Sequence, residues 1–164
     1  METPSPEPAQ TYLQLRGRIL GLNPEELHLT PSSSAPHVWG VLVETGYEVG
    51  IATLVSFADG TTSLYYSTGG GVLGSSDYTP LAKASKTLVV EAEKHLKRMS
   101  KNKDDIKLPE VGQVSFILLT YSGVYSAQAY EEQLASGSHP LSPLFTQARQ
   151  TLTQLRVLAE KKRK

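Results

Sequence analysis

The sequence of 164 residues contains no cysteine, and this absence excludes several kinds of site at once. Disulfide frameworks, thiol nucleophiles, iron–sulfur clusters and thiolate zinc sites all require cysteine sulfur. Net charge is also missing, since 16 basic side chains balance 16 acidic ones, so the chain lacks the overall signature of a polyanion-binding protein. With 39% hydrophobic and 20% charged residues, the composition is that of a globular protein.

Long hydrophobic runs are absent as well. A membrane-spanning helix needs about 18 to 20 apolar residues, and the longest apolar stretch, Phe116–Leu119, is far shorter. The N-terminus has neither the basic start nor the apolar segment of a secretory signal. These absences predict a cytoplasmic protein with no membrane partner.

The chain is expected to fold as one domain between two short terminal segments. Residues 1–10 (METPSPEPAQ) are acidic and proline-rich, a composition that predicts a disordered leader. Residues 11–160 form the expected domain, and residues 161–164 (KKRK) form a basic tail. A domain of this size can bury a sufficient core without disulfides.

Alternating apolar residues predict five strands. Three of them lie in a meander between His37 and Ser67, where Asp59-Gly60 suits a tight hairpin turn. A fourth strand, Gly112–Tyr121, is apolar on both faces, as expected for a strand covered on both sides. A fifth strand follows over Val124–Tyr130.

Helical spacing of apolar residues predicts three helices. The first covers Tyr12–Leu22, although alternation there leaves a strand as the alternative. The second covers Thr79–Met99, and the third begins at Ser142. Between the first helix and the strands, Pro24–His28 is expected to form a helical turn that Asn23 and Glu26 cap.

The resulting order is α–βββ–α–ββ–α, which predicts an α+β fold with a mainly antiparallel five-stranded sheet and helices packed on it. This element order resembles that of small dimeric chaperones of bacterial secretion systems and, less closely, that of roadblock and profilin-like sheets. No motif residue carries the resemblance, so it transfers no functional residue to this chain.

The most unusual local feature is the glycine-rich segment Ser67–Ser76, between a predicted strand and a predicted helix. Its glycines satisfy the spacing G-x-G-x-x-G, and the backbone N–H groups of such a loop can hold a phosphate. Ser75 stands where a P-loop needs lysine, and the preceding strand belongs to an antiparallel meander, which argues against a nucleotide site. The candidate anion-binding residues are Ser67, Thr68, Gly69, Gly70, Gly71, Gly74, Ser75, Ser76 and Lys83. The alternative is a flexible connection between sheet and helix.

Histidines and carboxylates show no spacing typical of a metal or catalytic site. The four histidines form neither an H-E-x-x-H motif nor an i, i+4 pair, and His95 is expected to be exposed on the polar side of its helix. Adjacent acids such as Glu25-Glu26 point apart on any regular element. The sequence therefore predicts no metal and no cofactor, and it contains no motif that supports an enzyme.

Charge is distributed unevenly along the chain. Residues 1–78 carry two basic and eight acidic side chains, whereas residues 79–164 carry fourteen basic and eight acidic ones. Such asymmetry can mark an electrostatic surface for one partner or for a second copy. Nucleic acid is disfavoured as the partner, because no aromatic residues are interleaved with the lysines of the second helix.

Tyrosines supply the candidate interface residues, of which Tyr47, Tyr65 and Tyr125 are the main ones. Together with the absence of a catalytic motif, they predict a non-enzymatic protein-interaction or regulatory module that pairs with a protein partner or forms a homodimer. The alternative is a protein that binds a small anionic ligand, or an enzyme, built around Ser67–Ser76.

Overall fold

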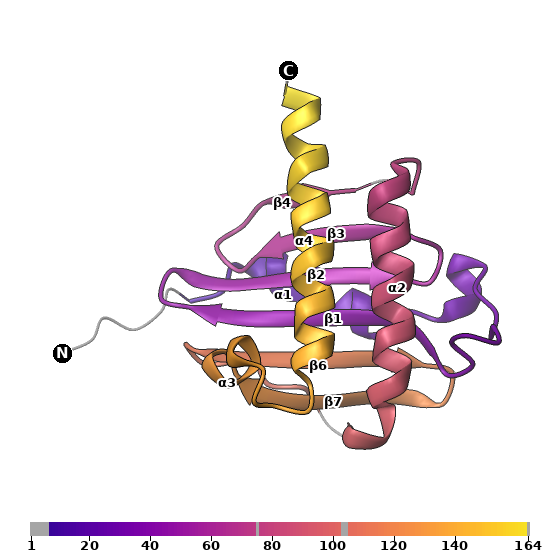
Figure 1. Cartoon of the computed structure of the whole chain (residues 1–164). Coiled ribbons are helices and arrows are strands. Elements are labelled where there is room, and N and C mark those ends of the chain that lie inside the picture. The colour runs from indigo at the N-terminus through magenta and orange to yellow at the C-terminus, as the bar shows by residue number, and fades with distance from the viewer. Residues whose placement is uncertain (1–6, 75, 103–104, 164) are drawn as a thin grey trace.

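The computed structural model describes residues 7–74, 76–102 and 105–163. Within them, seven strands form one antiparallel sheet in the order β4-β3-β2-β1-β6-β7-β5 (Figure 1). The strands are β1 Val38–Tyr47, β2 Gly50–Phe57, β3 Thr62–Tyr66, β4 Gly71–Leu73, β5 Ser100–Lys101, β6 Gln113–Thr120 and β7 Gly123–Tyr130. The α+β class and the helix-covered antiparallel sheet are therefore confirmed.

The predicted number of five strands is wrong, because a short strand is added at each edge of the sheet. At one edge, β4 pairs with β3, with Gly71 opposite Tyr65. At the other edge, β5 pairs with β7, with Lys101 opposite Tyr125. Strands of two or three residues are too short to show the alternation on which the prediction depends.

Helices cover both faces of the sheet. Their bounds are α1 Gln10–Leu20, η1 Pro24–Leu27, α2 Thr79–His95, η2 Leu96–Arg98, α3 Glu131–Ser136 and α4 Ser142–Arg163. Helices α2 and α4 lie side by side across one face, and α1 lies behind the sheet (Figure 1). The alternative of a strand in place of α1 is thereby excluded, and α3 is an additional short helix that the sequence did not predict.

The core has two parts because successive residues of the central strands point to opposite faces. Val41, Val43, Phe116 and Leu118 pack with Leu81, Leu88, Leu144 and Leu155 of α2 and α4. Leu42, Ile117 and Leu119 pack with Ile19 of α1 and with Trp39 and Val55 on the other face. This arrangement explains why β6 is apolar on both sides.

A buried polar cluster fixes α1 on the sheet. The Glu44 side chain of β1 is fully buried, and it accepts hydrogen bonds from Arg16 Nε at 2.7 Å and Nη2 at 2.8 Å. Thr53 donates to the same carboxylate at 2.9 Å, and its hydroxyl is also hydrogen-bonded to that of Tyr12 at 2.7 Å. A buried carboxylate needs such partners. Burial, followed by the charge of Glu44, raises the pKa of Tyr12 to about 12.

The cap of η1 agrees with the sequence prediction, whereas the exposure of His95 does not. The capping box of Asn23 and Glu26 at η1 is confirmed. The expectation of an exposed His95 is wrong, because this residue is buried, with Nε2 3.2 Å from the Glu91 carboxylate. The C-terminal end of α2 packs on the core, which buries this side of the helix. The polarity of His95 alone therefore predicted the wrong exposure.

The two terminal segments are only partly described. Residues 1–6 of the predicted leader and the last residue of the predicted basic tail lie outside the described residues. The remainder of the leader runs into α1, and Ala9 N–H donates to the carbonyl of Ser67 at 2.6 Å. In the described part of the chain, no helix has the length and apolar character needed to cross a membrane.

Candidate functional site

The glycine-rich segment Ser67–Ser76 does not form one continuous loop. Gly69 and Gly70 have φ angles of +110° and +79°, and they make the turn between β3 and β4. Such positive φ angles favour glycine because it has no Cβ atom. From Gly71 the chain forms β4, so the residues after the turn belong to the sheet.

Two backbone N–H groups that a phosphate would need already have partners in the sheet. Gly69 donates to the carbonyl of Tyr66 at 2.9 Å, and Gly74 donates to that of Thr62 at 2.8 Å. Gly74 is also tightly packed, since an added Cβ would lie 2.5 Å from Leu81 Cδ2. Glycine at position 74 is thus explained by close packing between the sheet and the helices, which leaves no room for a side chain.

The other residues of the segment lie in separate places. Ser67 is buried, and its hydroxyl accepts a hydrogen bond from Ile51 N–H at 2.7 Å. Ser76 and Lys83 line a shallow depression at the start of α2, Thr68 is exposed at the hairpin, and Ser75 lies outside the described residues. The candidate residues are therefore divided between the two ends of β4, and anion binding by this segment stays a prediction.

A hollow of about 320 Å³ does lie beside the glycine turn, between α1 and β3. It is lined by Thr11, Tyr12, Leu15, Tyr65, Tyr66, Gly69, Gly70, Gly71 and Leu73. None of these side chains carries a charge, so this hollow offers no cation to an anionic ligand. Tyr65, predicted as an interface residue, is half-buried here against the α1 side of the core.

Both long helices of the helical face, α2 and α4, come from the basic half of the sequence. Among the side chains that the structure describes, the lysines and arginines of α2 and α4 are Lys83, Lys86, Lys94, Arg149, Arg156, Lys161 and Lys162. Acidic side chains on these two helices are fewer, namely Glu91, Glu93 and Glu160. Because both helices cover the same face of the sheet, the charge asymmetry along the chain is also an asymmetry in space (Figure 1).

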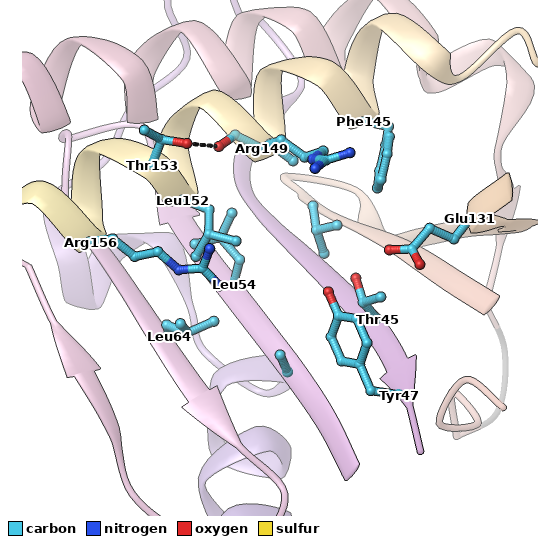
Figure 2. Close-up of a pocket in the computed structure, with 13 residues that line it drawn as sticks. Thr45, Tyr47, Leu54, Leu64, Glu131, Phe145, Arg149, Leu152, Thr153 and Arg156 are labelled. Atoms are coloured by element: carbon cyan, nitrogen blue, oxygen red, sulfur yellow. Dashed lines mark hydrogen bonds between the residues drawn. The ribbon is translucent and has the colours of Figure 1, made fainter. Parts of the chain in front are cut away.

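Beneath α4, a second hollow of about 170 Å³ opens on this cationic face (Figure 2). Its floor is apolar and consists of Val43, Ala52, Leu54, Leu64, Ala148 and Leu152. Ala52 of β2 and Ala148 of α4 end at Cβ, so neither of these side chains fills the space between helix and sheet. An apolar group of a ligand can therefore enter here and lose contact with water.

The polar rim of this hollow comes from one side of α4. Arg149, Thr153 and Arg156 follow the i, i+4, i+7 spacing that places side chains on one helix face. Among the residues that the structure describes, neither arginine forms an ion pair with a carboxylate. The Arg149 guanidinium lies 5.6 Å from the centre of the Phe145 ring. Both arginines are exposed and can bind a carboxylate or phosphate from outside.

Three further side chains complete the rim opposite α4: Thr45 and Tyr47 of β1 and Glu131 of α3 (Figure 2). Thr45 and Tyr47 are two residues apart on β1, so their side chains lie on the same face of the sheet. Burial and the nearby charge of Glu131 raise the pKa of Tyr47, while Thr45 and the two arginines act in the opposite direction. The rim thus contains positive, negative and neutral hydrogen-bonding groups around an apolar floor.

Of the predicted site residues, only Tyr47 lines this hollow. Tyr125 is half-buried on β7 and packs against the core on the helical side. The prediction missed Arg149 and Arg156, which come from one helix, and Ala52, which comes from a distant strand. A local signal existed for the arginines, since both neighbour the apolar stripe of α4 and share one helix face. No local signal exists for Ala52.

Within the described ranges, no group of three or more histidine, aspartate or glutamate side chains could hold a metal ion. Comparisons of the chain with protein-family models, with curated proteins and with solved structures gave no match. The function is therefore inferred from the site itself.

Proposed function

We propose that this protein is a non-enzymatic interaction module that binds an acidic and apolar segment of a partner protein in the hollow beneath α4. The observation that carries the proposal is the pairing of two arginines, both without a carboxylate partner among the described residues, with an apolar floor. An acidic group would bind Arg149 and Arg156, and a neighbouring apolar side chain would enter the hollow. Exposed Tyr47 at the rim adds the kind of aromatic surface that is enriched at interfaces.

The size of the hollow favours a protein segment over a whole small molecule. Pockets for drug-sized ligands usually enclose about 300–1,000 Å³, whereas this hollow measures about 170 Å³. That volume suits one inserted side chain. The remainder of a bound segment would then lie on the surface along α4.

Selection from a library of random 12-residue peptides displayed on phage tests the proposal. We expect the enriched peptides to combine aspartate or glutamate with a large apolar residue. For a fluorescein-labelled selected peptide, the double substitution Arg149→Ala/Arg156→Ala should raise the Kd at least about tenfold, because hydrogen bonds to charged groups contribute about 1.5–3 kcal/mol each.

The matched control is Lys83→Ala/Lys86→Ala, which removes the same charge from the same face but outside the hollow. This control should change the Kd less than about threefold at physiological salt, where exposed charges are screened beyond about 8 Å. Equal losses in both double variants would show general charge attraction and overturn the proposal, as would a selection with no arginine-dependent peptide. If an enriched sequence matches the turn Pro24–Leu27 (PEEL), in which Glu25 and Glu26 are exposed, a second copy of this chain becomes the partner to test.

A small organic anion is the second candidate, favoured by the placement of both arginines and Thr153 on the rim of a hollow with apolar lining. Benzoate and phenylphosphate are suitable probes, titrated against the amide spectrum of the labelled protein. This function would be favoured if the amide resonances of α4 and β1–β3 alone shifted saturably with the probe and the phage selection yielded no peptide.

A further inference from the structure

We infer that the bound segment is bipolar: it has an acidic group at Arg149 and Arg156, an apolar anchor in the hollow, and a basic group at Glu131 and Glu132. This inference rests on the proposed function and specifies the chemistry of the partner. It follows from the shape and the charge of the surface on both sides of the hollow.

The hollow beneath α4 adjoins two further depressions and forms a larger groove with them. A neighbouring depression of about 700 Å³ shares Tyr47, Glu131 and Arg149 with it and extends to Tyr130 and Glu132. A third depression, of about 290 Å³, shares Phe145, Arg149 and Thr153. Because Arg149 lines all three, we treat them as one continuous surface, the α4 groove.

The two walls of the α4 groove carry opposite charges. Arg149 and Arg156 line the side formed by α4, whereas Glu131 and Glu132 line the side formed by α3. A uniformly acidic segment would place one of its carboxylates against Glu131, and like charges brought together at an interface weaken binding. A basic group at the α3 wall avoids the repulsion and forms a new ion pair.

The spacing of the two arginines allows two acidic residues of an extended segment to bind them. Arg149 and Arg156 are separated by about 10 Å along the helix axis, at 1.5 Å per residue. An extended chain covers that distance in about three residues, at about 3.3 Å each. Two exposed tyrosines, Tyr47 with 42% and Tyr130 with 57% of its surface accessible, border the α3 wall and can pack against the segment.

The test is a double-mutant cycle between the protein and a peptide selected on it for arginine-dependent binding. The peptide's basic residue is replaced by glutamine, and the protein carries Glu131→Gln/Glu132→Gln. On the wild-type protein, the peptide replacement should raise the Kd about fivefold; on the variant, it should change the Kd by less than about 1.5-fold. A variant with Glu110→Gln/Glu160→Gln, exposed acids that do not line the hollow, serves as the charge-matched control and should retain the fivefold effect.

The outcomes separate this inference from the proposed function. Selected peptides that require the arginines but lack a basic residue would overturn the bipolar partner and leave the acidic–apolar site intact. A fivefold effect that persists in Glu131→Gln/Glu132→Gln would likewise overturn the bipolar partner alone. A selection that yields no arginine-dependent peptide overturns both. Thermal unfolding of each variant checks that the fold is retained.

Discussion

At the scale of single residues, a buried carboxylate determines where α1 packs. Glu44 is surrounded by hydrogen-bond donors from α1 and β2, and Arg16 also donates to the carbonyl of Ile106 at 3.1 Å. Removing one member of a buried ion pair leaves an uncompensated charge, which usually costs more than the pair contributes. The cluster therefore gives α1 one position on the sheet.

Tyr12 makes the stability of this cluster dependent on pH in the alkaline range. The phenol has an ordinary pKa of 10.0 and a pKa of about 12 in the folded protein, so the folded state holds its proton more tightly. Tyr12 thereby contributes of the order of 2–3 kcal/mol to the free energy of unfolding. This contribution is fully present below pH 10 and is lost as the pH rises through about 12. Urea unfolding between pH 8 and 12 should show this decline.

The variant Tyr12→Phe is the control for the alkaline decline. It should be less stable than the wild type at pH 8, because Thr53 loses a buried hydrogen-bond partner. Its stability should nevertheless fall less steeply above pH 10. Part of the decline will remain, since burial also raises the pKa values of Tyr47 and Tyr121. Parallel curves for the two proteins would contradict the assignment.

At the scale of elements, Glu93 ties α2 to the start of β1. Its Oε1 accepts hydrogen bonds from the backbone N–H groups of His37 at 2.7 Å and Val38 at 3.0 Å. Burial alone would raise the pKa of Glu93, but these hydrogen bonds and the His37 side chain outweigh burial and lower it. The ionised form is therefore the one that holds helix and strand together.

Low pH should weaken the hydrogen bonds between the Glu93 carboxylate and the start of β1. A carboxyl with a lowered folded pKa stabilises the protein above its unfolded pKa of about 4.5, and that contribution is lost as the pH falls through the folded value. We expect Glu93→Gln to be less stable than the wild type at pH 7 by about 1–2 kcal/mol, with the difference shrinking toward pH 3. Glu160→Gln, which removes the same charge at an exposed position of α4, is the control for general charge effects. A constant difference at all pH values would refute this role.

Periodicity explains which elements were predicted and which were not. The long strands and α2 and α4 repeat apolar residues often enough for the pattern to be read from the sequence. The strands β4 and β5 and the six-residue α3 have no room for a repeat, and α3 lies directly after β7 without an intervening turn. Burial of His95 was missed because helix packing, not residue polarity, decides which side of a helix faces inward.

The candidate site was harder to predict than the fold. Tyr47 was expected at an interface because of its residue type, and it does line the hollow beneath α4. The floor, however, combines Ala52 of β2 with Ala148 of α4, residues that are far apart in sequence and have no chemistry of their own. Only the tertiary structure shows that both alanines line one hollow and leave space in it.

At the scale of the whole molecule, the cationic face formed by α2 and α4 should act on the rate of association. Long-range attraction increases the rate of encounter with an acidic partner, whereas buried and hydrogen-bonded contacts set the rate of dissociation. Lysines outside the hollow and arginines within it should therefore affect different rate constants.

Stopped-flow binding of a selected acidic peptide can measure this difference. Lys83→Ala/Lys86→Ala should lower the association rate constant about two- to fivefold at about 20 mM salt and leave dissociation unchanged. Arg149→Ala/Arg156→Ala should mainly raise the dissociation rate constant. At about 500 mM salt, the effect of the lysine variant should disappear, because screening shortens the range of the attraction to a few ångströms. A lysine effect that persists at high salt would argue against steering.

The short edge strands also have a consequence for how the protein can assemble. An exposed long strand is a template on which other chains can add backbone hydrogen bonds without regard to sequence. Here β4, with three residues, and β5, with two, occupy the two ends of the sheet. The two edges nevertheless differ. β4 pairs with three of the five residues of β3, whereas β5 pairs only with Tyr125 and Ser126 of β7. The part of β7 from Ala127 to Tyr130 has no strand on its outer side among the described residues, so an added strand would find more unpaired backbone there than beside β4.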